Sequence, residues 1–377
     1  MSSPKLPLQS FRLKNFKAIR DSGIIRFTPL TVLIGNNGSG KSSLIEGLEM
    51  FKEIGIHGID ESLQPWRGFE HVWNKAITHK PKKNREGKLQ AANPLTFSFK
   101  GRATPLIEET TTIELSLGMD PEENKVYIHN YHVLSSNYMP HGRIISNFKA
   151  ESQLTTDQRL SLMVGSWKFI NLSPQEMLYP RPQKRTLGGV GLIKNGANVA
   201  EYLQNIRDSN LGIFNDIVET LRHVLPCVDD LQPAITSELE RNVYLSLTEK
   251  GIDEKIPGWL LSQGTLRILA LLGLFRHPRP PSVIIIEEIE NGLDPRTIHM
   301  VVDEIRSFVQ SGKGQVIATT HSPYLLDLLS LSQIIVVERD EQGSPIFTRP
   351  ADNKELAEWV EKFAPGKLYT MGNLTRR

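Results

Sequence analysis

The stretch "PLTVLIGNNGSGKSSLIEGLEMF", residues Pro29–Phe51, decides the fold class of this chain. It begins with the apolar run Leu30–Ile34, which predicts a buried β-strand. The next segment, Gly35–Ser42, has the sequence "GNNGSGKS" and fits the pattern G-x-x-x-x-G-K-[ST] of phosphate-binding loops. From Ser43 onward, apolar residues recur at helical spacing. The order of strand, glycine-rich loop and helix therefore predicts a nucleotide-binding P-loop protein.

The residue types of this phosphate loop are suited to binding a nucleotide. Its glycines let the backbone point N–H groups inward, and the start of the helix adds partial positive charge where phosphates would sit. We expect the ammonium group of Lys41 to reach the β and γ phosphates and the hydroxyl of Ser42 to bind Mg²⁺. The predicted nucleotide-binding residues are Gly35, Asn36, Asn37, Gly38, Ser39, Gly40, Lys41, Ser42 and Ser43.

The composition indicates an ordinary globular protein of 377 residues, of which 39% are hydrophobic. The formal net charge of +2 gives no global attraction to nucleic acid, so such binding would need a local patch. The single cysteine, Cys227, excludes intramolecular disulfides and cysteine-rich zinc sites. The chain has no apolar run long enough to span a membrane and no apolar signal core at its N-terminus. We therefore expect a cytoplasmic protein.

Strand and helix signals continue through the rest of the chain. Residues 11–27 predict two strands joined by a turn near Asp21–Gly23, because apolar and polar residues alternate on both sides of it. No internal repeat and no sustained heptad pattern is present, so a long coiled-coil arm is not expected. The further predicted elements are an antiparallel meander at 95–134, an irregular connection at Pro174–Gly196, two helices within Asn198–Leu225, a strand at 241–250 and a closing hairpin at 336–347.

Two acids follow a β-branched apolar run in "SVIIIEEIENGLDP", Ser282–Pro295. In P-loop folds, a buried strand that ends in carboxylates carries the Mg²⁺ ligand and the group that orients the attacking water. We expect Glu287 to bind Mg²⁺, directly or through water, and Glu288 to polarise the water. The alternative is that both acids only cap the strand or pair with lysines. The phosphate loop upstream in the same alternating fold argues against that alternative.

The segment "LLSQGTLRILALLGLF", Leu260–Phe275, predicts a strongly apolar helix with Ser262 as its N-cap. Ser262 and Gly264 would offer a second anion-binding helix end. If this helix projects from a separate lobe, it would not easily reach the nucleotide of its own phosphate loop. It would then meet a nucleotide that is held by another copy of the chain. An ordinary capped helix is the alternative interpretation.

A third segment, "GQVIATTHSPYLLDLL", predicts a strand that ends at Thr319–His321. A lone histidine at the end of a strand is more often structural than catalytic. This histidine, however, lies beyond the acidic strand, where a residue that senses the γ-phosphate is expected. We therefore regard His321 as a candidate catalytic residue beside Glu288.

Together these motifs resemble the ATP-binding-cassette (ABC) ATPases of the SMC/RecF/OLD group. The resemblance rests on the phosphate loop and on the sequences "LSQGT", "IIIEE", "NGLDP" and "TTHSP". The sequence "LKNFKAI" before the loop is similar to that group's N-terminal strand. With "KNGANVAEYLQNI" and "KLYTMGNL" included, the chain is similar to small stand-alone predicted AAA-family ATPases related to OLD and RecF proteins. Some relatives act in DNA repair or in bacterial defence against phage.

The resemblance implies an α/β fold of the P-loop NTPase class and ABC-ATPase type. It predicts a mixed sheet core with an antiparallel β lobe and an inserted helical lobe. It also implies ATP and Mg²⁺ as cofactors, and a homodimer that encloses ATP between its subunits. The expected domains are a discontinuous ATPase core at 1–55 and 245–345, an inserted β and helical lobe at 56–244 that leads into the helix at Ser262, and a C-terminal extension at 346–377.

The resemblance adds candidate nucleotide-binding residues outside the phosphate loop. These are Ser262, Gly264, Asp294, Asn15 and Lys17. Much of the wider group has Asp at the position of Glu287, and the additional methylene would shift the metal ligand outward. Such a shift would affect the rate of hydrolysis more than the binding of ATP. No glutamine is identified that joins the metal to the inserted lobe.

Three other function classes compete with an ATPase switch. A transporter's nucleotide-binding subunit is disfavoured, because Lys41 and Ser262 are much further apart than expected in that family and no coupling segment is evident. A scaffold or sensor that binds ATP and hydrolyses it slowly is not excluded by the sequence. A self-contained OLD-type nuclease needs an appended Toprim domain, and the residues that follow His321 are too few to form one.

The expected partners are a second copy of the chain, bound through ATP, and a separate effector protein such as a nuclease or a toxin. DNA is a possible partner, because the basic segment His79–Lys88, "HKPKKNREGK", could neutralise phosphates. A basic run of this kind is more often a solvated loop. No membrane partner is expected.

Overall fold

The computed structural model of the chain divides into two compact units, each built from segments that are distant in the sequence. The phosphate loop lies in the first unit, whereas Ser262, Glu288 and His321 lie in the second. The first unit comprises Met1–Trp167, Ser330–Phe363 and Leu368–Arg377, and the second unit comprises Lys168–Leu329 and Ala364–Lys367. The structure describes residues 6–74, 82–83, 89–90, 93–102, 110–120, 123–135, 158–185, 189–237, 239–354, 356, 359 and 362–374.

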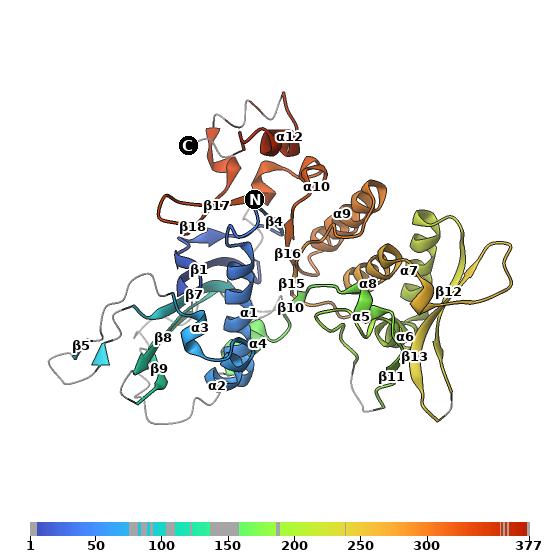
Figure 1. Cartoon of the computed structure of the whole chain (residues 1–377), viewed down its shortest axis with the longest axis horizontal. Coiled ribbons are helices and arrows are strands. Elements are labelled where there is room, and N and C mark those ends of the chain that lie inside the picture. The colour runs from blue at the N-terminus through green and yellow to red at the C-terminus, as the bar shows by residue number, and fades with distance from the viewer. Residues whose placement is uncertain are drawn as a thin grey trace. The chain divides into compact units, whose positions relative to one another are not determined.

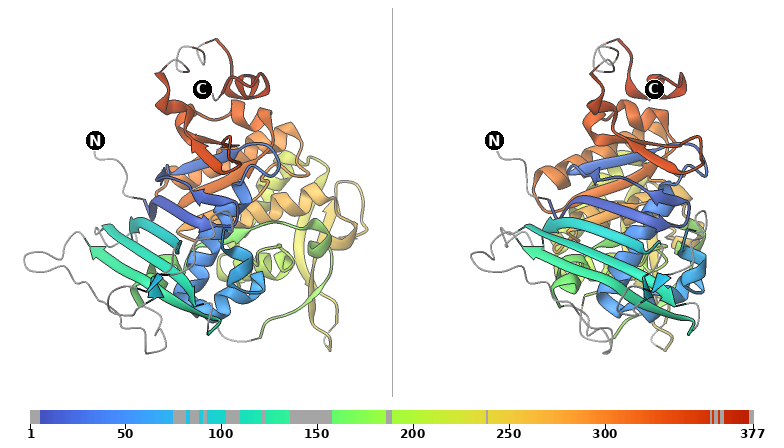
Figure 2. Two further views of the ribbon diagram at one scale, coloured as in Figure 1. Left: turned by 60° about the vertical axis from the view of Figure 1, so that its left-hand side comes forward. Right: turned by 90° about the vertical axis from the view of Figure 1, so that its left-hand side faces the viewer.

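An antiparallel sheet with the strand order β2-β1-β7-β8-β9 forms one part of the first unit, and β3 also pairs with β1. Its strands are β1 (Leu8–Phe16), β2 (Ile19–Asp21), β3 (Ile25–Arg26), β7 (Leu95–Arg102), β8 (Thr110–Asp120) and β9 (Lys125–Ser135). Figure 2 shows β7, β8 and β9 side by side. Buried residues alternate along β7, as expected for a sheet with one face in the core. The meander predicted at 95–134 is confirmed.

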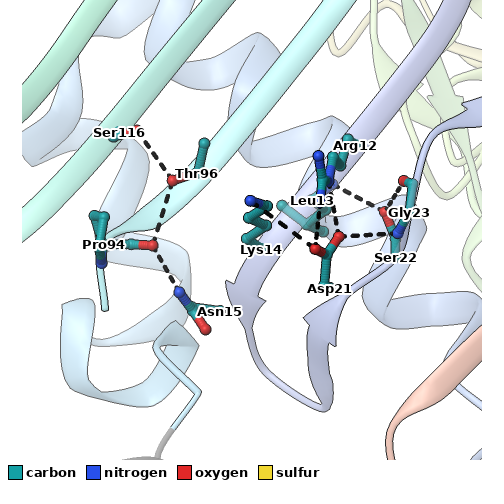
Figure 3. A network of polar contacts seen from close by, with 10 residues as sticks. All are labelled: Arg12, Leu13, Lys14, Asn15, Asp21, Ser22, Gly23, Pro94, Thr96 and Ser116. Carbon is teal, nitrogen blue, oxygen red and sulfur yellow. Dashed lines mark hydrogen bonds and ion pairs between the residues drawn. The ribbon is translucent and has the colours of Figure 1, made fainter. Parts of the chain in front are cut away.

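The first reversal of the chain lies earlier than predicted. The turn between β1 and β2 is at Lys17–Ala18 and not near Asp21. Asn15 (φ 58°) and Lys17 (φ 47°) adopt left-handed conformations there, and the absence of glycine and proline explains why the sequence pattern did not indicate the turn. Asp21 ends β2 and forms an ion pair with Arg12 at 2.5 Å (Figure 3).

Helix α1 (Lys41–His57), which begins at the phosphate loop, packs on this antiparallel sheet. The ring of Phe51 on α1 stacks on that of Phe99 on β7, with 5.6 Å between ring centroids. Gly47 allows the close approach, because a Cβ at this position would lie 2.3 Å from the side chain of Leu13. These contacts hold α1 on the sheet, and they thereby set the direction of its N-terminus.

A mixed ladder of strands forms the other part of the first unit. β4 (Leu30–Ile34) pairs in parallel with β17 (Ile334–Arg339), and β17 pairs antiparallel with β18 (Pro345–Thr348). All five residues of β4 are buried, as its apolar sequence predicts. The closing hairpin predicted at 336–347 is confirmed by β17 and β18.

A parallel ladder of β10 (Lys168–Ile170), β15 (Val283–Ile286) and β16 (Gln315–Thr320) lies in the second unit. All residues of β15 and β16 are buried. Because parallel strands end at the same edge, the segments that follow β15 and β16 emerge together. Helices α8 (Gln263–Arg276) and α9 (Pro295–Gln310) pack on each other in this unit.

A second group of helices and strands surrounds α8. The two helices predicted within Asn198–Leu225 are confirmed as α6 (Val199–Ser209) and α7 (Leu211–Val224). Figure 1 shows them close to α8 and the strands β12 and β13. The connection Pro174–Gly196 is largely irregular, as predicted. The remaining elements here are α5 (Pro174–Met177), β11 (Arg181–Pro182), β12 (Val228–Ile235), β13 (Asn242–Glu249), β14 (Ile256–Pro257), η2 (Gly258–Leu260) and α10 (Pro323–Asp327).

Several short elements complete the description. They are α2 (Ile59–Leu63), η1 (Gln64–Trp66), α3 (Phe69–Val72), β5 (Lys82–Lys83), β6 (Leu89–Gln90), α4 (Gln158–Val164), η3 (Leu331–Gln333), η4 (Pro350–Asp352) and α12 (Pro365–Thr370). Within the described residues, no helix combines the length and the apolar character that crossing a membrane requires.

Candidate functional site

The phosphate loop in the first unit has the backbone that its glycines predict. Gly38 (φ 74°) and Gly40 (φ 116°) adopt conformations that other residues rarely reach, and Gly40 is the N-cap of α1. A Cβ at Gly35 would lie 2.1 Å from the carbonyl oxygen of Val337. The loop is therefore closely packed at its start, and its glycines give the turn that leads into the helix a backbone that other residues rarely adopt.

Lys41 is buried at the centre of the loop, with 7% of its side chain area exposed. Its Nζ donates hydrogen bonds to the carbonyl oxygens of Gly35 at 2.6 Å and Asn36 at 3.1 Å. The hydroxyl oxygen of Ser39 is also buried, and it has no hydrogen-bond partner within the described residues. The loop thus holds a cation and a hydroxyl where an anion with several acceptor oxygens would satisfy both.

The hairpin of β17 and β18 packs against the phosphate loop and holds it through contacts with two of its glycines. Arg339 at the end of β17 donates from Nε to the carbonyl oxygen of Gly38 at 2.7 Å, and from Nη1 to that of Gly343 at 2.5 Å. A Cβ at Gly40 would lie 2.4 Å from the ring of Pro345 in β18. The sequence analysis did not identify Arg339, because no motif marks it and its contact depends on the pairing of β17 with β4.

Asn15 and Lys17 lie at the turn between β1 and β2. The side-chain amide of Asn15 donates to the carbonyl oxygen of Pro94 at 2.9 Å (Figure 3). The backbone N–H of Lys17 donates to Val72 at 2.6 Å, and its ammonium group forms an ion pair with Glu46 of α1. Both residues therefore connect this turn to neighbouring segments of the first unit. Their contact with a nucleotide stays a prediction.

The acidic loop Glu287–Asp294 follows β15 in the second unit. The backbone N–H of Glu287 donates to Ile170 of the neighbouring strand at 2.9 Å. Glu288 is exposed and adopts φ 47°, an unfavourable conformation for a residue with a side chain. Its N–H donates to the hydroxyl of Thr319 at 2.8 Å, and its carboxylate accepts a hydrogen bond from the side chain of Asn291. Strained residues that are held in this way are found mainly at functional sites.

His321 is exposed at the end of β16, beside the acidic loop. Its backbone N–H donates to Oε1 of Glu290 at 2.6 Å. The N–H of Ser322 donates to the hydroxyl of Thr320 at 3.0 Å, and the hydroxyl of Ser322 caps α10. The structure therefore brings the predicted residues Glu288 and His321 to neighbouring strand ends. Glu290, which contacts His321, was not identified from the sequence.

The N-cap predicted at Ser262 is confirmed. The hydroxyl of Ser262 accepts a hydrogen bond from the N–H of Thr265 at 3.0 Å and lies 2.8 Å from the Thr265 hydroxyl. A Cβ at Gly264 would lie 2.9 Å from the carbonyl oxygen of Gly292, so the start of α8 packs closely on the acidic loop. One turn further on, the buried Arg267 donates to Leu172 at 2.7 Å.

Asp294 ends the acidic loop as the N-cap of α9. Its Oδ1 accepts hydrogen bonds from the N–H groups of Arg296 at 2.9 Å and Thr297 at 3.2 Å, and its Oδ2 accepts from the Thr297 hydroxyl at 2.5 Å. The bond from the Thr297 side chain is the main reason that the pKa of Asp294 lies below its usual range. The carboxylate of this predicted nucleotide-binding residue is therefore committed to the helix cap.

The residues that could hold Mg²⁺ fit that ion by their chemistry. Ser42 lies in the first turn of α1, and Glu287 follows a buried strand, so both supply oxygen ligands on fixed elements. Ser43 follows on the same helix turn.

The basic segment His79–Lys88, which was considered for DNA binding, lies outside the described residues except for the short strand β5.

Comparison with protein families identifies the type of domain. Residues 140–327 match the family described as "AAA domain, putative AbiEii toxin, Type IV TA system", and residues 7–135 match the "AAA ATPase domain". Over 349 residues the chain is 23% identical to an "ATP/GTP phosphatase" of Helicobacter pylori, covering 85% of this chain and 87% of that protein. Two ATPase-domain models thus match separate segments of the chain, and the prediction of an ATPase is confirmed.

Comparison with solved structures identifies the fold. The Smc head bound to the C-winged helix domain of ScpA matches with a TM-score of 0.59 and 14% identity, covering 90% of this chain and 96% of that one. An Smc head domain with an extended coiled coil, in a complex derived from Pyrococcus furiosus, matches with a TM-score of 0.57 and 13% identity, covering 94% and 99%. This likeness to Smc head domains confirms the predicted α/β P-loop fold.

Proposed function

We propose that this protein is an ATP-hydrolysing switch that binds ATP on its phosphate loop and closes around it as a homodimer. The observation that carries the proposal is the loop itself, in which the buried ammonium group of Lys41 donates hydrogen bonds to the backbone carbonyls of Gly35 and Asn36. Phosphate oxygens carry negative charge and accept stronger hydrogen bonds than carbonyls do. A nucleoside triphosphate therefore suits this site better than a neutral ligand.

In the proposed ATP-bound state, Lys41 turns from the loop carbonyls to the β and γ phosphates. Ser42 and Glu287 would hold Mg²⁺, which would supply charge neutralisation to the phosphates. The N–H groups at the start of α1 add partial positive charge beside the same phosphates. Binding thus depends on residues of the loop and on one acid of the strand end.

Hydrolysis in this proposal depends on the two residues at the strand ends of the second unit. Glu288 orients the attacking water and accepts its proton, for which an exposed carboxylate on a constrained backbone is suited. His321 hydrogen-bonds to the γ-phosphate and reports its presence. The left-handed backbone of Glu288 supports this assignment, since three hydrogen-bonding contacts keep a strained residue in one place.

The homodimer is proposed from the start of α8, where the hydroxyl of Ser262 caps the helix. Ser262 is exposed, and the backbone at Gly264 has no side chain to shield it. A helix start of this kind binds anions, so it would complete the site of a second copy. Asp294 would contribute through its backbone, because its carboxylate caps α9.

The pathway is proposed from the family description. A family described as a putative toxin of a toxin–antitoxin system supports a cytoplasmic role in bacterial anti-phage defence, with a separate nuclease or toxin as effector. A role in DNA repair, with DNA as a further partner, is the second candidate pathway. Co-purification of tagged protein with ATP, in wild-type form and as Glu288→Gln, would identify the effector.

A mixing experiment tests the ATPase and its dimer together. Lys41→Ala has a defective phosphate loop and an intact α8 start, whereas Ser262→Arg has the reverse. Each variant should be inactive alone, and a mixed dimer should regain part of the wild-type ATPase rate because one of its two sites is complete. Absence of recovery at every ratio, with dimers confirmed by light scattering and folding by thermal melts, would contradict the proposed dimer.

An ATP-dependent sensor with slow turnover is the second candidate function. The observation that favours it is Glu287, whose additional methylene relative to Asp would displace the metal ligand. Single-turnover measurements separate the candidates, because a switch that resets by hydrolysis needs a chemical step at least as fast as dimer opening. A sensor would bind ATP with the same dependence on Lys41 and release it unhydrolysed.

A further inference from the structure

Glu290 occupies a position between the two proposed catalytic residues of the second unit. It lies two residues after Glu288 in the acidic loop, and its Oε1 accepts a hydrogen bond from the backbone N–H of His321 at 2.6 Å. The backbone N–H of Ile289 in the acidic loop also donates to the carbonyl oxygen of Thr319 in β16, at 3.2 Å. Glu288 and His321 are thus linked through a short path that runs through the Glu290 side chain.

The backbone of His321 depends on this contact more than the strand residues before it do. The ladder between β15 and β16 ends with the pair Ile286↔Ala318, so His321 lies beyond the last paired residue. β16 itself ends at Thr320, and α10 begins only at Pro323. Within the described residues, the His321 N–H donates to the carboxylate of Glu290. A hydrogen bond to a carboxylate is stronger than one between neutral groups, so it can hold a segment that the sheet no longer fixes.

The carboxylate of Glu290 is itself held in a low-solvent environment. Its second oxygen, Oε2, is buried and has no hydrogen-bond partner within the described residues. Burial of a charged oxygen without a partner is costly unless an opposite charge is near. The buried Arg267 of α8 supplies that charge: burial lowers the pKa of Arg267, and the negative charges of Glu288 and Glu290 oppose this shift. Glu290 therefore contacts the segment at the end of β16 and lies within electrostatic range of Arg267.

We infer that Glu290 is a positioning residue for ATP hydrolysis, which sets the place of the His321 imidazole by holding the backbone N–H of that residue. The inference rests on the proposed function, because it gives Glu290 a role only through His321. It also predicts that Glu290 contributes to the chemical step and little to ATP binding, since its carboxylate is engaged by the backbone N–H of His321.

A double-mutant cycle tests this inference. Glu290→Ala should lower kcat about tenfold, equivalent to about 1.4 kcal/mol, and leave KM for ATP within about twofold. His321→Ala should lower kcat at least as much. The double variant should be no slower than His321→Ala alone, because without an imidazole there is nothing for Glu290 to position. A double variant slowed by the product of the two single effects would overturn the inference, since Glu290 would then act independently of His321.

Two further variants keep the result interpretable. Glu290→Gln retains an oxygen acceptor for the His321 N–H and should keep more activity than Glu290→Ala; equal loss in both would contradict the hydrogen-bond role. Glu304→Gln is the matched control, because it removes another carboxylate charge of the second unit, one paired with Arg276 on α8. Its kcat should equal that of wild type, whereas a tenfold loss would show that general destabilisation explains Glu290→Ala.

The outcomes separate this inference from the proposed function. If the wild-type protein hydrolyses ATP and Lys41→Ala does not, the proposed function stands, and the cycle alone decides the role of Glu290. If the wild-type protein has no ATPase activity, the proposed function fails and the role of Glu290 in hydrolysis fails with it.

Discussion

The phosphate loop and the acidic loop both place reactive groups at the end of a buried strand, but they do so by different means. In the phosphate loop, Lys41 contacts Gly35, only 6 residues away, and the glycines between them adopt the positive φ angles that the loop requires. In the acidic loop, Glu288 and Glu290 are held by Thr319 and His321, each 31 residues away. The first geometry is a property of a short sequence, whereas the second exists only after two strands have paired.

The largest expected effect lies in the acidic loop. Glu288→Gln keeps the shape of the side chain and the hydrogen bond from Asn291 but removes the base, so the rate of hydrolysis should fall about 10²- to 10⁴-fold. ATP binding should be unchanged, and the protein should accumulate as an ATP-bound dimer if hydrolysis normally opens it. Phosphate release and light scattering with ATP and Mg²⁺ measure both effects. Turnover at the wild-type rate would show that Glu288 is not the base.

The next effect concerns the phosphate loop. Lys41→Ala removes the buried cation, and loss of its charged hydrogen bonds should weaken ATP binding about 10- to 100-fold. Titration with a fluorescent ATP analogue measures the affinity, and a thermal melt checks that the variant is folded. Glu288→Gln, measured in parallel, should bind as wild type does. Unchanged affinity in Lys41→Ala would remove the basis for placing the nucleotide on this loop.

A smaller effect tests whether the phosphate loop is as independent of tertiary contacts as its sequence suggests. Arg339→Ala removes the donor to Gly38, a contact worth about 1 kcal/mol, so ATP affinity should fall roughly fivefold. Arg349→Ala is the control, because this arginine of the same unit donates to Ser332 and Arg26 and not to the phosphate loop. Equal affinities in both variants and wild type would mean that the loop holds its shape unaided.

The smallest effect concerns the end of the acidic loop. Asp294→Ala removes the N-cap of α9 and should lower the free energy of unfolding by about 1 kcal/mol at neutral pH. Because the pKa of Asp294 is lowered in the folded protein, its ionised form contributes stability above its unfolded pKa of about 3.9. That contribution is lost as the pH falls through the folded pKa. Urea unfolding of wild type and Asp294→Ala should therefore differ most at pH 7, and the difference should become smaller as the pH falls.

Much of the fold was predictable from the sequence because its signals are local. The strand β4, the helix α1, the N-cap at Ser262 and the helices α6 and α7 each depend on residues within one or two turns of each other. The turn at Lys17–Ala18 was missed because non-glycine residues with positive φ are stabilised there by contacts with Val72, Asn74 and Pro94.

The candidate site was predictable in part for the same reason. The sequence indicated Lys41, Glu288 and His321, because motifs preserve the residue types that chemistry requires. It did not indicate Glu290 or Arg339, since a glutamate in a loop and an arginine at a strand end are common surface residues. Only the hydrogen bonds to His321 and Gly38 distinguish these two from other charged side chains.

The sequence by itself determined that this chain has a phosphate loop, a buried apolar strand followed by acids, and a capped apolar helix. Glycine conformations, hydrophobic spacing and N-cap chemistry each act over a few residues. Tertiary structure alone decided which groups hold these elements in place. The strained backbone of Glu288 is fixed by Thr319, and the segment at His321 is fixed by Glu290, across strands that are distant in the chain. Such contacts leave no pattern in the sequence, since any residue of the right charge at the right distance in space can make them.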